Sequence, residues 1–259
     1  KENFPKYPFR DFRYTKNYFQ TLISKMKSKT SSSIFLRAIG TLGGGNHYIE
    51  FNEDYDGKAY LTIHSGSRAL GQAVCDYHQG KITQENKNSL NNYLQNEELV
   101  EYLIDMIFAQ TVASMNRELM IKLIINEIGV EWNKDKLIET IHNYIDFKRL
   151  ILRKGAIAAE AGELCIISLN MRDGILLCKG KGNPDWNYSS AHGCGRLMSR
   201  TTARNKLRMD DFKKEMSEVY STSICKNTLD EAPMAYKDVE KIKQYIGDSV
   251  KIIKQLKPF

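Results

Sequence analysis

Apolar side chains recur with the period of an α-helix, about 3.6 residues, in four stretches of the chain. These stretches are residues 18–26, 92–127, 197–219 and 236–256. The longest is followed closely by Gly129, and glycine commonly ends helices, so the pattern predicts one long helix or a bent pair. The last stretch predicts a C-terminal amphipathic helix.

Short apolar runs with strand character lie between the helical stretches. Residues 48–51 and 58–63 are bounded by Gly and Asn/Asp clusters, which predicts two strands joined by a turn. Residues 164–168 and 175–179 have the same texture and are followed by a Gly-Lys-Gly-Asn-Pro loop. Because strands and helices come in blocks without regular alternation, we expect an α+β fold. Mixed or antiparallel sheets with surrounding helices are favoured over a doubly wound parallel sheet.

The composition is that of a globular chain. Its 259 residues are 42% hydrophobic and 27% charged, with a mean hydropathy of −0.46, which suits one large domain or two small ones. No run approaches the ~20 apolar residues of a membrane-spanning helix. Residues 1–33 are basic and aromatic, so we expect an N-terminal arm and helix before a main domain over residues 34–259. The chain begins Lys-Glu-Asn-Phe-Pro-Lys, without an initiator Met or a signal peptide, and we expect a fragment or a processed end.

Charge and cysteine content limit the classes of protein that fit this sequence. There are 38 basic and 31 acidic side chains, a net charge of +7, which is the sign but only a modest magnitude for a polyanion binder. The five cysteines are odd in number, scattered and never spaced Cys-x-x-Cys, which argues against a disulfide scaffold and a zinc ribbon. A reducing compartment fits best, so we expect a cytoplasmic protein.

Four of the five histidines lie in unusual local sequences, and His78 is the exception. They are His47 after Gly-Gly-Gly-Asn, His64 before Ser-Gly-Ser-Arg, His142 before Asn-Tyr, and His192 before Gly-Cys-Gly-Arg. His47 and His64 flank the first predicted strand pair, and neighbouring strands lie about 5 Å apart, so a hairpin would bring the two imidazoles together. Such a pair is a metal-site geometry, whereas structural histidines are the alternative, because no second ligand motif reinforces the site.

Glycines and arginines beside these histidines suit phosphate groups. Successive N–H groups of residues 43–45 could form an anion-binding nest, or the glycines could serve only a tight turn. Ser65, Ser67 and Arg68 offer donors to phosphate oxygens, although a buried arginine that holds a turn is the rival interpretation. Arg196 precedes a predicted helix, where phosphate recognition and a simple helix start are equally compatible with the sequence.

Basic residues are interleaved with these motifs, and a solvated face would explain most of them. They are Arg149, Arg153, Lys154, Lys179, Lys181, Arg196, Arg200 and Arg204. Their position beside glycine loops favours a polyanion ligand, because Arg, Lys and loop N–H groups make most contacts to nucleic-acid phosphates.

Five sequence blocks together resemble one family. They are Gly-Thr-Leu-Gly-Gly-Gly-Asn-His-Tyr-Ile-Glu (40–50), His-Ser-Gly-Ser-Arg (64–68), His-Asn-Tyr (142–144), Arg-Lys-Gly-Ala (153–156) and Ala-His-Gly-Cys-Gly-Arg-Leu-Met-Ser-Arg (191–200). A further block, Asp-Glu-Ala-Pro-Met-Ala-Tyr-Lys-Asp (230–238), follows them. In this order they resemble the RtcB family of GTP-dependent RNA ligases.

The resemblance implies an RtcB-like α+β catalytic domain and a specific reaction. An RNA 3′-phosphate or 2′,3′-cyclic phosphate is joined to an RNA 5′-hydroxyl, with GTP and Mn²⁺ required, in RNA repair or tRNA splicing. His192 corresponds to the histidine that carries GMP as a phosphoramidate. His47, His64 and His142 correspond to ligands of two metal ions. The other implied site residues are Arg68 and Arg196 at reacting phosphates, with Asn46, Glu50, Gly193, Gly195 and Tyr236 around the nucleotide.

Three departures from the family pattern accompany the resemblance. The family has an Asp and a Cys ligand upstream of the first histidine motif, whereas no cysteine here precedes Cys75. It also ends in a lysine, where this chain ends at Phe259, and Cys194 and residues 167–174 replace commoner residues. We therefore expect an N-terminally incomplete, divergent member. The alternative is a catalytically impaired relative that binds RNA or nucleotide.

Overall fold

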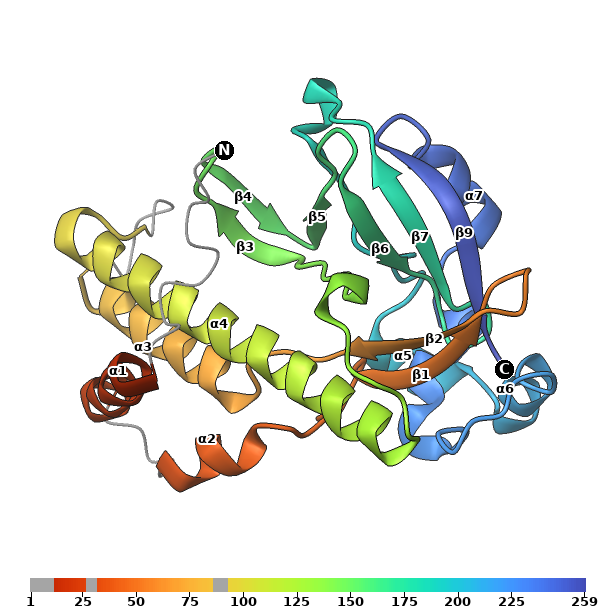
Figure 1. Ribbon diagram of the computed structural model, residues 1–259, viewed down its shortest axis with the longest axis horizontal. Coiled ribbons are helices and arrows are strands. Elements are labelled where there is room, and N and C mark those ends of the chain that lie inside the picture. Colours follow the sequence, from red (N-terminus) through yellow and green to blue (C-terminus); the bar gives the residue numbers. More distant parts are fainter. Residues whose placement is uncertain (1–11, 27–31, 86–92) are drawn as a thin grey trace. The chain divides into compact units, whose positions relative to one another are not determined.

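The computed structural model describes residues 12–26, 32–85 and 93–259 (Figure 1). The chain divides into two compact units, the first from residues 1–48 and 63–132 and the second from residues 49–62 and 133–259. The expected boundary at residue 33 stays a prediction, and residues 1–11 of the expected arm lie outside the described ranges. Among the described helices, none combines the length and apolar composition needed to cross a membrane.

The first unit is helical. Its helices are α1 (Phe12–Lys25), α2 (Ser32–Ala38), α3 (Ala69–Glu85) and α4 (Asn96–Glu127), and α4 runs alongside α3 in Figure 1. The apolar faces meet in a core of Leu22, Phe35, Leu70, Val74, Phe108 and Ala109. The prediction of one long helix is thus confirmed by α4, which ends just before Gly129 at φ +72°.

A buried carboxylate ties three helices of the first unit together. The side chain of Asp105 on α4 is fully buried and accepts hydrogen bonds from Tyr18, from Lys25 at 2.7 Å and from His78 at 2.8 Å. A buried charge is stable only when it is paired and hydrogen-bonded. His78, which stood in no special sequence context, is therefore a core residue that holds α3 against α4.

The second unit is built on a five-stranded sheet in the order β2-β1-β9-β7-β6. These strands are β1 (Tyr48–Glu53), β2 (Ala59–His64), β6 (Leu164–Ser168), β7 (Ile175–Gly180) and β9 (Val250–Pro258). β9 pairs antiparallel with both β1 and β7, and β7 pairs antiparallel with β6. The strand pairs predicted around residues 48–63 and 164–179 are confirmed.

Smaller elements surround this sheet. β3 (Asn143–Asp146) pairs with β4 (Ile151–Lys154), and β5 (Ala156–Ala158) pairs with β8 (Ser189–Ala191), both antiparallel. The helices are α5 (Arg200–Lys206), α6 (Met209–Glu215) and α7 (Val239–Tyr245), with 3-10 turns η1 (Lys134–Lys136), η2 (Pro184–Trp186), η3 (Lys226–Glu231) and η4 (Pro233–Ala235). The α+β class expected from the sequence is confirmed.

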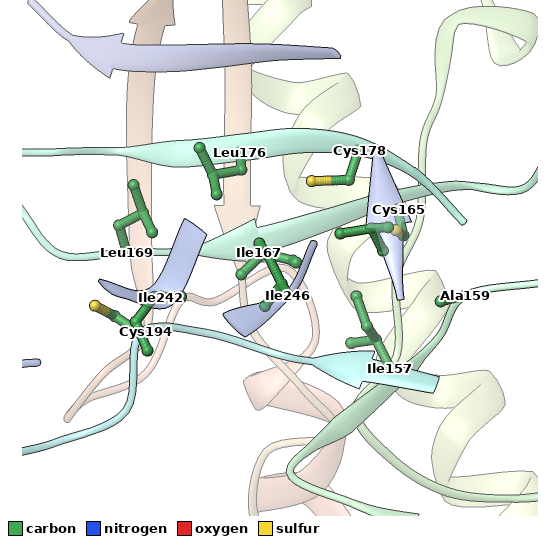
Figure 2. Close-up of a cluster of buried hydrophobic side chains, with 11 residues drawn as sticks. Ile157, Ala159, Cys165, Ile167, Leu169, Leu176, Cys178, Cys194, Ile242 and Ile246 are labelled. Carbon is green, nitrogen blue, oxygen red and sulfur yellow. The ribbon is translucent and has the colours of Figure 1, made fainter. Parts of the chain in front are cut away.

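The core of the second unit lies on one face of the sheet (Figure 2). Ile167 of β6 and Leu176 of β7 are fully buried and pack in one cluster with Ile246, which follows α7. Cys194 belongs to the same cluster and is 1% exposed. The segment that carries His192 is therefore anchored in the core two residues further along the chain.

An ion pair attaches the β1–β2 hairpin to β9. Asp54, in the hairpin turn, accepts hydrogen bonds from Lys254 Nζ at 2.6 Å and from the Tyr60 hydroxyl at 2.9 Å. The ammonium of Lys254 holds the pKa of the Asp54 carboxyl well below its usual range. The hairpin that ends in His64 is thus fastened to the middle of the sheet.

In the last third of the chain one helical prediction was wrong, and another was confirmed as two short helices and not one. The stretch 236–256 contains only α7 and then β9, because Gly247 and Asp248 break the helix and the following residues alternate between buried and exposed. As the central strand of a sheet, residues 250–258 gain more from pairing than from a helical stripe. The stretch 197–219 forms two short helices, and α2, α3, β3, β4, β5 and β8 were not predicted.

Candidate active site

The β1–β2 hairpin brings two imidazoles together in the first unit. His47 immediately precedes β1 and His64 is the last residue of β2, and their ring centroids lie 5.8 Å apart. The proximity predicted from the strand spacing is therefore confirmed. Their role as metal ligands stays a prediction.

The backbone around His47 selects one tautomer of its ring. Nδ1 of His47 lies 2.9 Å from the carbonyl oxygen of Leu42. A carbonyl only accepts, so this hydrogen bond requires the proton on Nδ1 and leaves the lone pair on Nε2. Metal-binding histidines commonly have this arrangement, with a carbonyl partner for the nitrogen that does not bind the ion. The ring of His47 thus fits a ligand that uses Nε2.

Arg68 lies across the glycine-rich loop that leads to His47. Gly43 has φ +99°, a conformation that favours glycine, and a β-carbon added there would lie 1.8 Å from Nη1 of Arg68, so the guanidinium lies directly on the loop. The same Nη1 lies 3.1 Å from Nδ1 of His47, but it cannot donate to a nitrogen that carries a proton. Arg68 therefore holds the loop and also keeps N–H donors beside His47. The structure thus agrees with both roles considered for it, as a residue that holds a turn and as a phosphate contact.

Ser65 was considered a phosphate donor from the sequence, but its role in the structure is to hold the backbone. Its side chain is buried, and its hydroxyl donates to the carbonyl oxygen of Leu42 at 2.8 Å. The donor is thus directed into the protein, where it fixes the same carbonyl that orients His47.

A second pair of histidines lies in the second unit. The ring centroids of His142 and His192 are 4.9 Å apart, and both residues contact Gly155. The N–H of Gly155 donates to the carbonyl of His142 at 2.8 Å, and the carbonyl of Gly155 accepts from Nδ1 of His192 at 2.6 Å. His192 therefore carries its proton on Nδ1, and Nε2 has the free lone pair of a nucleophile.

The segment that follows His192 is fixed by the ends of two other elements. Ser168, at the end of β6, donates its N–H to the carbonyl of His192 at 3.3 Å and accepts from the N–H of Cys194 at 2.8 Å. Gly193 between them would clash with this strand if it carried a β-carbon, 2.8 Å from the Ser168 carbonyl oxygen. Lys237 lies over Gly195 on the other side. The backbone of the segment from His192 to Cys194 is thus held by the end of β6.

Arg196 is engaged with protein groups on all sides. Its guanidinium contacts Glu231 at 3.2 Å and the Tyr236 hydroxyl at 3.3 Å, and it also donates to the carbonyl oxygens of Met198 and Asp230. The hydroxyl of Tyr236 donates to Glu231, and burial with this carboxylate raises the pKa of Tyr236. These contacts match the structural interpretation of Arg196, and its role at a phosphate stays a prediction.

Two buried carboxylates organise an arginine row beside this network. Asp230 and Glu231 are almost fully buried and are paired with Arg200 and Arg204 as well as Arg196. The arginines stand at intervals of four residues, while Arg200 and Arg204 remain half exposed. The motif at 230–238 was noted in the sequence, but the contacts of its carboxylates with basic side chains were not; the four-residue spacing of the arginines was the available signal.

Glu50 is a partly buried carboxyl group on β1. Burial raises its pKa to about 7, although a hydrogen bond from the Asn52 side chain opposes this shift. The amide of Asn52 is itself held by the Thr62 hydroxyl of β2 at 2.7 Å. Asn46, by contrast, is exposed in the loop before His47. A carboxyl held this way can change its charge near neutral pH.

The interleaved basic residues divide into structural and exposed groups. Arg153 is 1% exposed and bonds to Tyr144, Asp146 and Ser189, so it is a core residue and not a polyanion contact. Arg149 stacks on Tyr188 and pairs with Glu160. Lys154, Lys179 and Lys181 are exposed, and a polyanion role for them stays a prediction.

Metal-ligand groups in the described residues are pairs and not larger clusters. Within residues 12–26, 32–85 and 93–259, no three His, Cys, Asp or Glu side chains gather as a metal site. The donor chemistry nevertheless fits a borderline divalent ion, because His47 and His64 offer two imidazole nitrogens side by side and the Leu42 carbonyl at Nδ1 of His47 leaves Nε2 for a ligand. His142 is placed in the second unit, beside His192.

Comparison with known proteins shows the family. The model of the family described as tRNA-splicing ligase RtcB matches residues 12–259. The chain belongs to the RtcB family. An RNA-splicing ligase RtcB1 of an Escherichia coli strain, ATCC 25922, is 31% identical over 244 residues, which cover 85% of this chain and 59% of that protein. The RNA-splicing ligase RtcB of Escherichia coli K12 is 30% identical with the same coverage, and the tRNA-splicing ligase RtcB of Aeropyrum pernix is 26% identical over 85% of this chain.

The chain spans about three fifths of the length of these RtcB relatives, 59% for both Escherichia coli proteins. The RtcB motifs found in the sequence fall into both structural units. His47, His64 and Arg68 belong to the first, and His142 and His192 belong to the second. Gly155, in the block at 153–156, is the residue whose contacts to two histidines the sequence alone did not reveal.

Proposed function

We propose that this RtcB-family chain carries the nucleotide-transfer chemistry of an RNA ligase. The reaction joins an RNA 3′-phosphate or 2′,3′-cyclic phosphate to an RNA 5′-hydroxyl with consumption of GTP. The observation that carries the proposal is the hydrogen bond between Nδ1 of His192 and the Gly155 carbonyl, because it leaves Nε2 as a nucleophile.

His192 would act first. Its Nε2 attacks the α-phosphorus of GTP, a P–N bond forms, and pyrophosphate leaves. Before the next step, water would open a 2′,3′-cyclic phosphate end, breaking its P–O2′ bond, to give a 3′-phosphate. The RNA 3′-phosphate then attacks the phosphorus bound to His192, so that the P–N bond breaks and His192 regains its lone pair. The RNA 5′-hydroxyl finally displaces GMP from the activated 3′-phosphate and releases its proton to solvent. The Gly155 carbonyl stabilises the cationic imidazole of the intermediate by accepting from its Nδ1–H.

The metal ligands proposed for Mn²⁺ are His47, His64 and His142. Bound Mn²⁺ would supply charge neutralisation at phosphate oxygens. The tautomer of His47, fixed by the Leu42 carbonyl, supports this assignment. The protein's own part is to hold the ring of His47 through the Leu42 carbonyl and to keep His64 beside it.

Recognition of guanine would rest on Glu50, with Tyr236 near the base. A carboxylate can accept from both N1–H and the exocyclic amine of guanine, whereas adenine has no N1–H to donate. Gly193 and Gly195 would let the nucleotide approach the backbone, and Asn46 would contact its phosphates. Arg68 and Arg196 would stabilise negative charge that develops at the reacting phosphates.

Covalent labelling tests the proposal. The full-length protein is incubated with Mn²⁺ and GTP that is radiolabelled at the α-phosphate, and we expect an acid-labile label on protein. His192→Ala should abolish the label, whereas Lys214→Ala, at an exposed position on α6, should retain it. Label that persists in His192→Ala would contradict the nucleophile. Retained GTP or RNA binding without any label would support the impaired relative instead.

A further inference from the structure

Asn116, in the middle of α4, is fully buried and bonds to two separate loops of the first unit. Its Oδ1 accepts from the N–H of Gly40 at 2.6 Å. Its Nδ2 faces the carbonyl oxygens of Thr41 at 3.3 Å and Gly66 at 3.2 Å, and the Ser65 hydroxyl at 3.2 Å. Every polar atom of the amide is therefore used on loop atoms, and none on α4 itself.

The two loops are those that carry the first histidine pair. Residues 40–46 lead into His47, and residues 65–68 follow His64 directly. The Ser65 hydroxyl, which accepts from Asn116, donates to the Leu42 carbonyl, and that carbonyl accepts from Nδ1 of His47. An unbroken path of hydrogen bonds thus runs from Asn116 to the ring of His47.

α4 is a suitable base for this path. It packs along α3 and is held there by the Asp105 network, so Asn116 projects from a fixed helix. The next residue, Arg117, adds a second attachment by donating from Nη1 to the Ser65 carbonyl at 2.9 Å. Both loops are therefore attached to the same helix, and this attachment fixes the distance between them.

We propose that Asn116 is a positioning residue that sets the spacing and ring orientation of His47 and His64 for metal binding. The proposal rests on the proposed function, because it assigns the two histidines to Mn²⁺. Groups that orient metal-binding histidines typically change metal affinity by about 10- to 100-fold when they are removed. Asn116 acts through the Ser65 hydroxyl and the Leu42 carbonyl.

Three variants and one matched control test this role in the full-length protein. Asn116→Leu removes all the bonds, Asn116→Asp keeps the acceptor for Gly40 but loses the donors, and Ser65→Ala interrupts the path with a smaller change. The control, Thr111→Val, alters a buried residue of the same helix whose hydroxyl, among the described residues, bonds to the Ile107 carbonyl within α4. It shows what loss of a buried polar group does without any contact to the loops.

Binding of Mn²⁺ alone, measured by calorimetry, is the first measurement. We expect affinity to fall about 10- to 100-fold in Asn116→Leu and Asn116→Asp, less in Ser65→Ala, and to stay unchanged in Thr111→Val. The second measurement is amide hydrogen exchange in metal-free protein. The Gly40 amide should exchange faster in Asn116→Leu but stay protected in Asn116→Asp, which retains its acceptor.

The outcomes separate this proposal from the proposed function. If His47→Ala weakens Mn²⁺ binding and the Asn116 and Ser65 variants do not, the positioning role is overturned while the metal site stands. If the unmutated protein binds no Mn²⁺, both are overturned. Should Asn116→Leu fail to fold, Asn116→Asp and Ser65→Ala decide by the same two measurements.

Discussion

Nδ1 of His192 lies 2.6 Å from the carbonyl oxygen of Gly155, which is a short hydrogen bond between a ring and a backbone group 37 residues earlier. The backbone at Gly155 has φ +65°, a conformation that side chains rarely adopt. The orientation of the proposed nucleophile therefore depends on a conformation that only glycine adopts at low cost.

Gly155→Ala should consequently affect both stability and chemistry. The left-handed backbone costs an alanine about 1–2 kcal/mol, which urea unfolding would measure. Relaxation of this backbone would move the Gly155 carbonyl that accepts from Nδ1 of His192, so we also expect slower GMP labelling. Gly162→Ala is the control, because φ is +83° there and its neighbour is the Lys179 side chain. Equal loss of labelling in both variants would contradict the orienting role.

The carboxyl of Glu50 predicts how GTP binding depends on pH. Burial raises its pKa to about 7, so the carboxylate that would accept from guanine is lost as the pH falls through this value. Below pH 7 the dissociation constant for GTP should rise by up to about tenfold per pH unit, and it should level off above pH 8. Glu50→Gln should bind GTP weakly with no step near pH 7, as fluorescence titration between pH 6 and 8.5 would show.

The same shift has a consequence for folding. A carboxyl whose pKa is raised in the folded state holds its proton more tightly there than in the unfolded chain. Its contribution to stability is therefore full below the unfolded pKa, about 4.3, and is lost as the pH rises towards 7. Glu50→Gln should lessen this loss of stability.

The pair of Asp54 and Lys254 predicts the opposite pH dependence. Lys254 lowers the pKa of the Asp54 carboxyl, so the stability it contributes is present above the usual carboxyl pKa and is lost as the pH falls through the lowered value. Lys254→Ala should lower the melting temperature at pH 7 and move acid unfolding to higher pH. Lys251→Ala, an exposed position of the same strand, should change neither. Identical thermal and acid unfolding of Lys254→Ala and the unmutated protein would refute the attachment of the hairpin to β9.

Arg68 and Arg196 should differ in what their removal costs. Arg196 bonds to a buried carboxylate and a carbonyl, so Arg196→Ala should lower the free energy of unfolding by about 2 kcal/mol. Arg68 lies on the glycine loop, and Arg68→Ala should cost less stability while it slows strand joining at saturating RNA. Denaturant unfolding and single-turnover ligation separate the two effects. An unchanged joining rate in Arg196→Ala would leave Arg196 a structural residue only.

The sequence predicted local elements well where one pattern dominated. The long apolar period ending before Gly129 became α4, and the turn between residues 51 and 58 became the β1–β2 hairpin that unites His47 and His64. β9 was taken for a helix because Val250, Ile253 and their neighbours satisfy a helical stripe as well as a strand pattern. Only pairing with β1 and β7, which are distant along the chain, decides between them.

Contacts of the candidate site were less accessible to sequence reasoning. Motif blocks indicated which histidines matter, but tautomers follow from carbonyl groups of Leu42 and Gly155 that no residue type specifies. Arg153 and Ser65 were grouped with phosphate donors because of their chemistry, and their burial assigns them to structure. Asn116 was not considered as a candidate residue, although a single amide side chain within a largely apolar helical stretch was a signal that the sequence contained.

The place of β9 in the sheet bears on how the protein is made. This strand is formed by residues 250–258 and lies between β1 and β7, so β2 and β1 join β7 and β6 only through it. During synthesis on the ribosome, the β1–β2 pair and the β6–β7 pair therefore cannot join into one sheet until residue 258 has left the exit tunnel. The proposed nucleophile segment, anchored on β6, is thus synthesised long before the sheet that supports it can close, and this interval exposes strand edges to other chains.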